Sequence, residues 1–172
     1  ASRSIDHLLS PCTVSVDHTK IECPTPAGVG DALEFVVTVD SLSSVTFSTA
    51  LRYTSPVVTG ISTLGSTDGG QTVTLTGSSF GPASATLTSA TYGQTGTELT
   101  ATNCAVIGQT SIECTSVPGV GTLHWITTVA GQSSAFDVGV SASYFIPTVT
   151  SVSGGSLETV GGTEQTIVGT QF

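Results

Sequence analysis

The histidines are the side chains best suited to acid–base catalysis or metal binding, and the chain has only three of them: His7, His18 and His124. A serine hydrolase would place one of them between a serine and a carboxylate. Serines are plentiful, but there is no G-x-S-x-G elbow and nothing singles one serine out. His18 belongs to the polar run "DHTK" (17–20), which is typical of a turn, and His124 occupies an alternating strand position beside Trp125. We therefore expect no enzymatic activity.

The 12 carboxylates are scattered along the chain, and none forms the D-x-D-x-D-G run of a calcium loop. Glu22 and Glu113 each precede a cysteine, where a strand-face position is a better interpretation than a metal ligand. Asp68 stands before Gly69-Gly70, which is ordinary turn chemistry. The glycine pairs separate strands and precede no helix, so no phosphate-binding loop is expected. The sequence predicts no metal and no other cofactor.

The charge balance excludes some classes of partner. With 12 acidic residues against 3 basic ones, the chain cannot neutralise phosphates, so we expect no nucleic acid partner. It has no basic amphipathic segment that would bind an anionic membrane. No apolar run approaches the roughly 20 residues of a transmembrane helix, so we expect no membrane insertion in this segment. Alternating Thr and Val favour strands over helices.

The cysteines form two close pairs, Cys12/Cys23 and Cys104/Cys114, and neither pair has the C-x-x-C spacing of zinc or redox motifs. An even number of cysteines in a β-rich, lysine-poor chain favours disulfides, with buried free thiols as the alternative. Disulfides form in oxidising compartments. We therefore expect an extracellular or cell-surface location.

The chain contains an internal repeat of about 92 residues, the separation of Cys12 from Cys104. At nearly the same offset, "IECPTPAGVG" (21–30) aligns with "IECTSVPGVG" (112–121). Further pairs at this spacing are Tyr53 with Tyr144, Pro56 with Pro147, Gly69-Gly70 with Gly161-Gly162, and Phe80 with Phe172. One repeating unit therefore explains nearly the whole chain.

Turn residues divide this unit into short strands, with a hairpin between its two cysteines. The other predicted strands are "PVVTGIS" (56–62), "QTVTLTG" (71–77), "ATLTSATY" (85–92), "LHWITTV" (123–129) and "AFDVGVSASYF" (135–145). Seven or so short strands with frequent turns predict an all-β fold, a Greek-key β-sandwich of immunoglobulin type. The expected core residues are Phe35, Tyr53, Val73, Leu75, Phe80, Trp125 and Tyr144. Trp125 could instead be a sugar-stacking platform, but its central strand position favours the core.

The order of these residues resembles the IPT/TIG immunoglobulin-like domain. The resemblance rests on Pro56, Ile61, Gly69, Gly70, Val73, Leu75, Gly77, Phe80, Gly81, Cys104, Ile112, Cys114, Pro118, Gly119 and Gly121. Such domains occur in plexin-type and Met-type receptors, in long surface ectodomains, beside polysaccharide enzymes and in Rel-type transcription factors. The resemblance implies a scaffold or interaction module and no particular chemistry.

On this pattern, residues 1–55 are the C-terminal part of one sandwich, residues 56–146 are a complete sandwich, and residues 147–172 are the N-terminal strands of a further one. The first and last parts are complementary. We expect the last part of one copy to complete the first part of the next, as in strand addition to an open sheet. The residues expected to bury apolar surface there are Ile146, Val149, Val152, Val160, Ile167 and Phe172.

This interpretation predicts an extracellular structural protein: a repeating subunit of a surface filament, a head-to-tail homopolymer of identical copies. One alternative is a segment of a long covalent array, such as a receptor or adhesin ectodomain that binds a protein or glycan. A weaker alternative is an accessory module of a carbohydrate-active enzyme. Ser and Thr number 55 of 172 residues and invite O-linked glycans, or are simply good solvent-face strand residues. Gln165 stands where the complete domain has Val73, so the last part is less apolar there.

Overall fold

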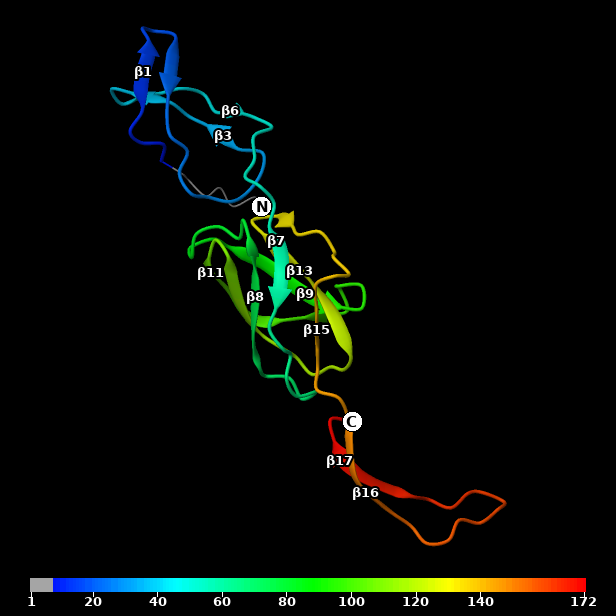
Figure 1. Cartoon of the computed structure of the whole chain (residues 1–172). Coiled ribbons are helices and arrows are strands. Elements are labelled where there is room, and N and C mark those ends of the chain that lie inside the picture. Colours follow the sequence, from blue (N-terminus) through cyan, green and yellow to red (C-terminus); the bar gives the residue numbers. More distant parts are fainter. Residues whose placement is uncertain (1–7) are drawn as a thin grey trace.

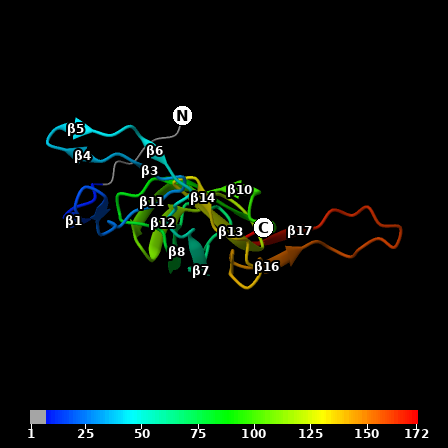
Figure 2. The same cartoon turned by 90° about the horizontal axis from the view of Figure 1, so that it is seen from above.

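A computed structural model describes residues 8–172. These residues fold into strands joined by loops (Figure 1). A central domain, residues 56–146, lies between two smaller parts. We call residues 8–55 the head segment and residues 147–172 the tail hairpin. The two parts extend from opposite sides of the central domain, as the view from above also shows (Figure 2). The molecule is therefore elongated, with apolar packing concentrated in its middle.

The central domain contains two antiparallel sheets, in the orders β11-β12-β8-β7 and β10-β9-β13-β14, and β15 also pairs with β13. Its strands are β7 (Val57–Ile61), β8 (Thr72–Ser78), β9 (Leu87–Gly93), β10 (Leu99–Thr100), β11 (Thr102–Gly108), β12 (Ser111–Thr115), β13 (Thr122–Val129), β14 (Gln132–Ser133) and β15 (Ser141–Ser143). Buried and partly exposed residues alternate along β13, as they do when one face of a strand is packed on a core.

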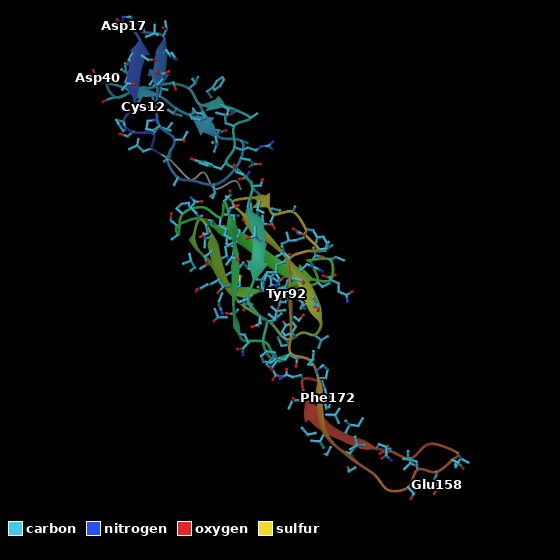
Figure 3. The ribbon with its side chains drawn as sticks, viewed as in Figure 1. Cys12, Asp17, Asp40, Tyr92, Glu158 and Phe172 are labelled. Atoms are coloured by element: carbon cyan, nitrogen blue, oxygen red, sulfur yellow. A yellow bond between two sulfur atoms is a disulfide. The ribbon has the colours of Figure 1, made fainter. Side chains whose placement is uncertain are left out.

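The core of the central domain lies between its two sheets. Val73, Leu75 and Phe80 are fully buried there, and Trp125 and Tyr144 are buried beside them. The ring of Trp125 stacks on that of Tyr92 at a centroid distance of 4.2 Å, and Figure 3 shows Tyr92 inside the domain. Trp125 is thus a core residue and offers no exposed face to a sugar. The hydroxyls of Tyr92 and Tyr144 bond to each other and to the backbone at Val117.

The head segment consists of three small two-stranded sheets. They pair β1 (Thr13–Val16) with β2 (Lys20–Glu22), β3 (Glu34–Phe35) with β6 (Phe47–Ser48), and β4 (Thr38–Val39) with β5 (Leu42–Ser43). Phe35 and Tyr53, expected in a core, are only partly buried. The reason is that the three small sheets of the head segment do not pack face to face on one another, so no closed core forms around these side chains.

The tail hairpin pairs β16 (Thr148–Ser153) with β17 (Thr166–Thr170), joined by a long loop. Of the residues expected to bury apolar surface at the joint, Val149, Val152 and Ile167 lie on these strands, whereas Ile146, Val160 and Phe172 lie outside them. Val160 is in a turn closed by the bond from Gly161 N–H to Glu158 O.

The strand expected at residues 135–145 is much shorter than predicted: it covers Ser141–Ser143, and Tyr144 adds an isolated bridge to Gly65. The side chain of Asp137 accepts a hydrogen bond from Gly139 N–H at 2.7 Å, and the Asp137 carbonyl accepts one from Val140 N–H. These bonds fold the preceding residues into a turn, which is a common role of Asp.

Candidate functional site

His18 and His124, the histidines among residues 8–172, lie on separate elements of the fold. His18 is in the turn between β1 and β2 with φ 59°. His124 lies on β13, with its ring edge-on to Phe136 and Nδ1 3.1 Å from the Val140 carbonyl oxygen. His7 is outside the described residues. Among residues 8–172, no group of three or more His, Cys, Asp or Glu could hold a metal ion.

Among residues 8–172, the carboxylate whose pKa is most strongly shifted, Glu98, has a structural role. Glu98 accepts hydrogen bonds from the hydroxyl and N–H of Thr95, and from Thr97 N–H. These bonds favour the charged form and lower the pKa of Glu98 to about 2, with the Thr95 hydroxyl as the main cause. Glu98 therefore closes its own exposed loop between β9 and β10.

The predicted disulfides are confirmed. Cys12 is bonded to Cys23 across β1 and β2, and Cys104 to Cys114 across β11 and β12. Among residues 8–172 no cysteine is free. Disulfides persist in oxidising surroundings, so the two bonds are consistent with a secreted or extracellular protein.

The first hairpin of the head segment reproduces a hairpin of the central domain. Along β11–β12, Val106 faces Ile112, and the register shifts before Gly108 faces Ser111. Along β1–β2, Val14 faces Ile21, and the register shifts before Val16 faces Lys20. These are the same pairs, displaced by the repeat. The sequence repeat is therefore a repeat of backbone structure, including its irregularities.

The tail hairpin likewise reproduces β7–β8. Val58 faces Gly77, and the register shifts before Ile61 faces Leu75. In the tail hairpin Val149 faces Gly169, and the register shifts before Val152 faces Ile167.

The two equivalent glycines, Gly77 and Gly169, also have the same surroundings. A Cβ added at Gly77 would lie 1.9 Å from the Val57 carbonyl oxygen and 2.6 Å from the Phe80 ring. At Gly169 it would lie 2.0 Å from the Thr148 carbonyl oxygen and 2.6 Å from the Phe172 ring. Each ring therefore packs over its glycine in the same way.

What differs between the matching hairpins is burial. In the central domain Val106 is 4 % exposed and Leu75 and Phe80 are 0 % exposed. Their equivalents Val14, Ile167 and Phe172 are 62 %, 55 % and 66 % exposed. The head segment and the tail hairpin thus present to solvent the apolar faces that the central domain buries between its sheets. Exposed apolar patches of this kind mark interaction sites.

The matching hairpins also differ in strand pairing. In the central domain β12 pairs with β11 on one side and with β8 on the other. Within residues 8–172, β2 pairs only with β1, and β17 pairs only with β16. The two strand edges that correspond to the β12–β8 pairing are therefore free in the described chain. A free edge presents unpaired N–H and C=O groups to a further strand.

The tail half of this surface was predicted from the sequence, and the head half was not. Val14 and Ile21 were not named, although both alternate with polar residues on the hairpin between Cys12 and Cys23. Both align with buried residues of the central domain, Val106 and Ile112. That alignment was the signal that could have identified them.

The central part of the chain matches a known protein family. The family model of the IPT/TIG domain matches residues 56–144. No curated protein and no solved structure matches the chain. Among residues 8–172 no helix is long and apolar enough to cross a membrane. The match contains both sheets of the central domain and the Cys104–Cys114 disulfide, and it covers more than half of the sequence, so the chain belongs to the IPT/TIG family of immunoglobulin-like domains.

Proposed function

We propose that this protein is a non-enzymatic structural subunit of an extracellular filament, in which the tail hairpin of one copy pairs with the head segment of the next. The observation that carries the proposal is the pairing of β12 with β8 in the central domain. The head segment holds the counterpart of β12, and the tail hairpin holds the counterpart of β8, each with a free edge among the described residues.

The β12–β8 pairing predicts the register between copies. In the central domain Ile112 faces Leu75 and Glu113 faces Thr74. The repeat converts these pairs into Ile21 facing Ile167 and Glu22 facing Thr166 of the neighbouring copy. Pro24, which has no N–H group, then ends the ladder of hydrogen bonds beyond β2.

Such a contact joins different surfaces of identical molecules. Head-to-tail contacts propagate into an open filament unless the rotation between copies closes a ring. The exposed side chains of Val14, Ile21, Ile167 and Phe172 supply the apolar surface that stabilises the joint. The acceptor hairpin is held together by the Cys12–Cys23 disulfide, so its edge is preformed.

Cross-linking tests the proposal. Two variants, Glu22→Cys and Thr166→Cys, are purified separately, mixed and oxidised. Directly opposed residues on antiparallel strands have Cβ atoms about 5 Å apart, within reach of a disulfide. The mixture is expected to give a covalent dimer of one chain of each kind. Thr150→Cys replaces Thr166→Cys as the matched control, since Thr150 lies on β16, on the far side of β17 from the joint. No preference for the Thr166 partner would refute strand pairing.

A second candidate is a segment of a long covalent array, such as a receptor or adhesin ectodomain with a protein or glycan partner. It is favoured by the covalent junction between the head segment and the central domain, since further domains could follow in the same way. The intact mass after denaturation, reduction and chemical deglycosylation distinguishes the two. A species near 17.2 kDa supports the filament subunit, and a species several times larger supports the array.

A further inference from the structure

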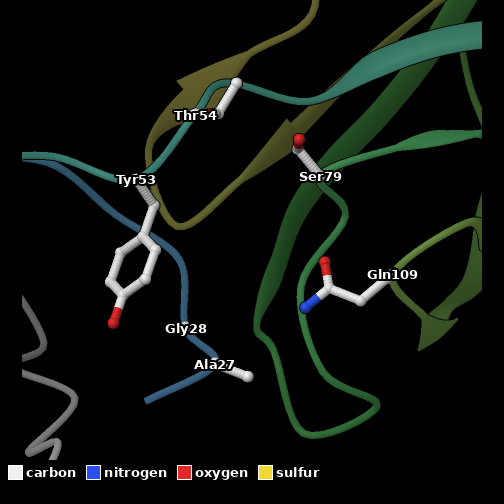
Figure 4. A pocket seen from close by; sticks show the side chains of 6 residues that line it. All are labelled: Ala27, Gly28, Tyr53, Thr54, Ser79 and Gln109. Carbon is white, nitrogen blue, oxygen red and sulfur yellow. The ribbon is translucent and has the colours of Figure 1, made fainter. Parts of the chain in front are cut away.

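The junction between the head segment and the central domain is polar. Gln132, buried at the start of β14, accepts a hydrogen bond from Gly30 N–H at 3.1 Å. Its amide also donates to Tyr53 O at 2.9 Å and to Ser55 Oγ at 3.5 Å. Figure 4 shows the cavity beside this contact, where Tyr53 and Thr54 lie across from Ser79 of the central domain. Gln132 therefore joins two successive repeats.

Among residues 8–172, the equivalent surface at the opposite end of the central domain has no such partner. The repeat converts Gly30 into Gly121 and Ser55 into Ile146. Both line a cavity with Val120, at the root of the tail hairpin. Val29 is 7 % exposed at the first junction, whereas its equivalent Val120 is 65 % exposed. This end of the central domain is thus an uncovered junction surface.

The element that would cover it is also in the chain. Gln132 is held on a hairpin where Val129 faces it and Ser134 N–H donates to Thr127 O. The hairpin β4–β5 has the same bonds, with Val39 facing Leu42 and Ser44 N–H donating to Val37 O at the same 2.8 Å. Leu42 thus occupies the position of Gln132, and it is 79 % exposed.

The end of the tail hairpin is hydrogen-bonded to the central domain. Gln171 Oε1 accepts hydrogen bonds from Thr67 N–H at 2.7 Å and from Thr67 Oγ1 at 3.1 Å. These bonds tie the end of β17 to the central domain. A head segment that pairs with β17 is thereby brought against the end of the same central domain.

We infer that Leu42 of one copy packs against Val120 and Ile146 of the preceding copy, as a second contact that fixes the angle of the joint. The inference rests on the proposed head-to-tail assembly and names a further surface within it. Its main support is that both residues of the contact pair differ together between the two junctions. The polar pair Gln132 and Ser55 inside one chain becomes the apolar pair Leu42 and Ile146 at the joint. A change on one side alone would leave a polar group facing an apolar one.

If both the strand pairing and the second contact form, Leu42 of one copy lies beside Ile146 of the preceding copy. Leu42→Cys and Ile146→Cys are prepared as separate proteins, mixed and oxidised. No cysteine of residues 8–172 is otherwise free, so the expected product is a covalent dimer with one chain of each kind. Val45→Cys is the matched control for Leu42→Cys. Val45 is equally exposed on the same segment, and its equivalent Ala135 is also exposed in the central domain.

The same experiment separates this inference from the proposed function. If Glu22→Cys and Thr166→Cys cross-link but Leu42→Cys and Ile146→Cys do not exceed the Val45 control, the second contact is refuted and strand pairing stands. If neither pair cross-links, both proposals fail. As an independent measurement, Leu42→Gln is expected to raise the critical concentration for assembly about tenfold through lost apolar burial. Val45→Gln is expected to leave it unchanged, and equal effects would overturn the inference.

Discussion

Truncation of Ile167 to alanine is expected to weaken assembly while leaving the single chain almost as stable as before. Ile167 is 55 % exposed on β17, whereas its equivalent Leu75 is 0 % exposed in the central core. If the joint resembles the central domain, assembly buries the remaining exposed half of this side chain.

The size of the effect follows from that difference in burial. Truncating a fully buried Leu or Ile to alanine destabilises a core by about 2–5 kcal/mol. Ile167 is already partly buried before assembly, so roughly 2 kcal/mol of this falls on the joint. That corresponds to a critical concentration raised about 30-fold. Thermal unfolding of the unassembled chain should shift little, because Ile167 lies outside the central core.

The assay is sedimentation of assembled material over a range of concentrations, beside calorimetry below the critical concentration. Val168→Ala is the matched control. Val168 is next along β17 and 49 % exposed, but its equivalent Thr76 faces solvent in the central domain. It should therefore leave assembly unchanged. Equal effects of Ile167→Ala and Val168→Ala would show that the joint does not bury the face predicted from the central domain.

Three further predictions concern the central domain. Gly77→Ala is expected to destabilise it by about 3 kcal/mol or more in denaturant unfolding, because the new Cβ would meet a carbonyl oxygen of β7 at 1.9 Å; Gly108→Ala, with open space around it, is the control. Glu98→Gln should remove acid sensitivity from the loop of residues 94–98. The folded-state pKa of Glu98 is lowered to about 2, so its contribution to loop order is present above about pH 4.5 and is lost as the pH falls through 2; amide exchange at low pH measures this, and unchanged exchange profiles would contradict it. Replacing both Cys104 and Cys114 by Ala should cost about 3 kcal/mol of unfolding free energy from loop entropy, and an unchanged denaturation midpoint would count against that.

The fold could be predicted from the sequence wherever the pattern is local. Leu75 and Trp125 lie in alternating strands, and a period of two assigns their side chains to one face. The paired cysteines flank a short turn, so their bonding needed no knowledge of the rest of the chain. The prediction of a strand at residues 135–145 was wrong in its first part, because a turn closed by Asp137 lies among the apolar residues there. Competition between a side chain and the backbone ladder is hard to recognise from composition.

The candidate site could be predicted only in part, because the repeat pattern identifies the apolar residues of the tail hairpin more readily than those of the head segment. Ile167 was recognisable because it aligns with Leu75 in an obvious strand. Leu42 was not recognisable, because its equivalent in the central domain, Gln132, is polar. The role of Gln132 is visible only in its contact with Gly30. A repeat predicts which residues are equivalent, and a structure is needed to show which equivalents touch across a junction.

The polar junction inside the chain and the proposed apolar joint between copies differ in chemistry, and this difference fits the different demands on each. Inside one chain, residues 53–56 tether the head segment to the central domain, and a tether gives the two parts an effective concentration that can reach the millimolar range. Hydrogen bonds from Gln132 then suffice to set the angle, although each contributes only about 1 kcal/mol net. A joint between separate chains lacks the tether and must offset the loss of translational and rotational freedom. An apolar contact between Leu42 and Ile146 contributes more per side chain than the polar pair it replaces. In a covalent array both junctions would be tethered, and nothing would favour an apolar pair at one and a polar pair at the other.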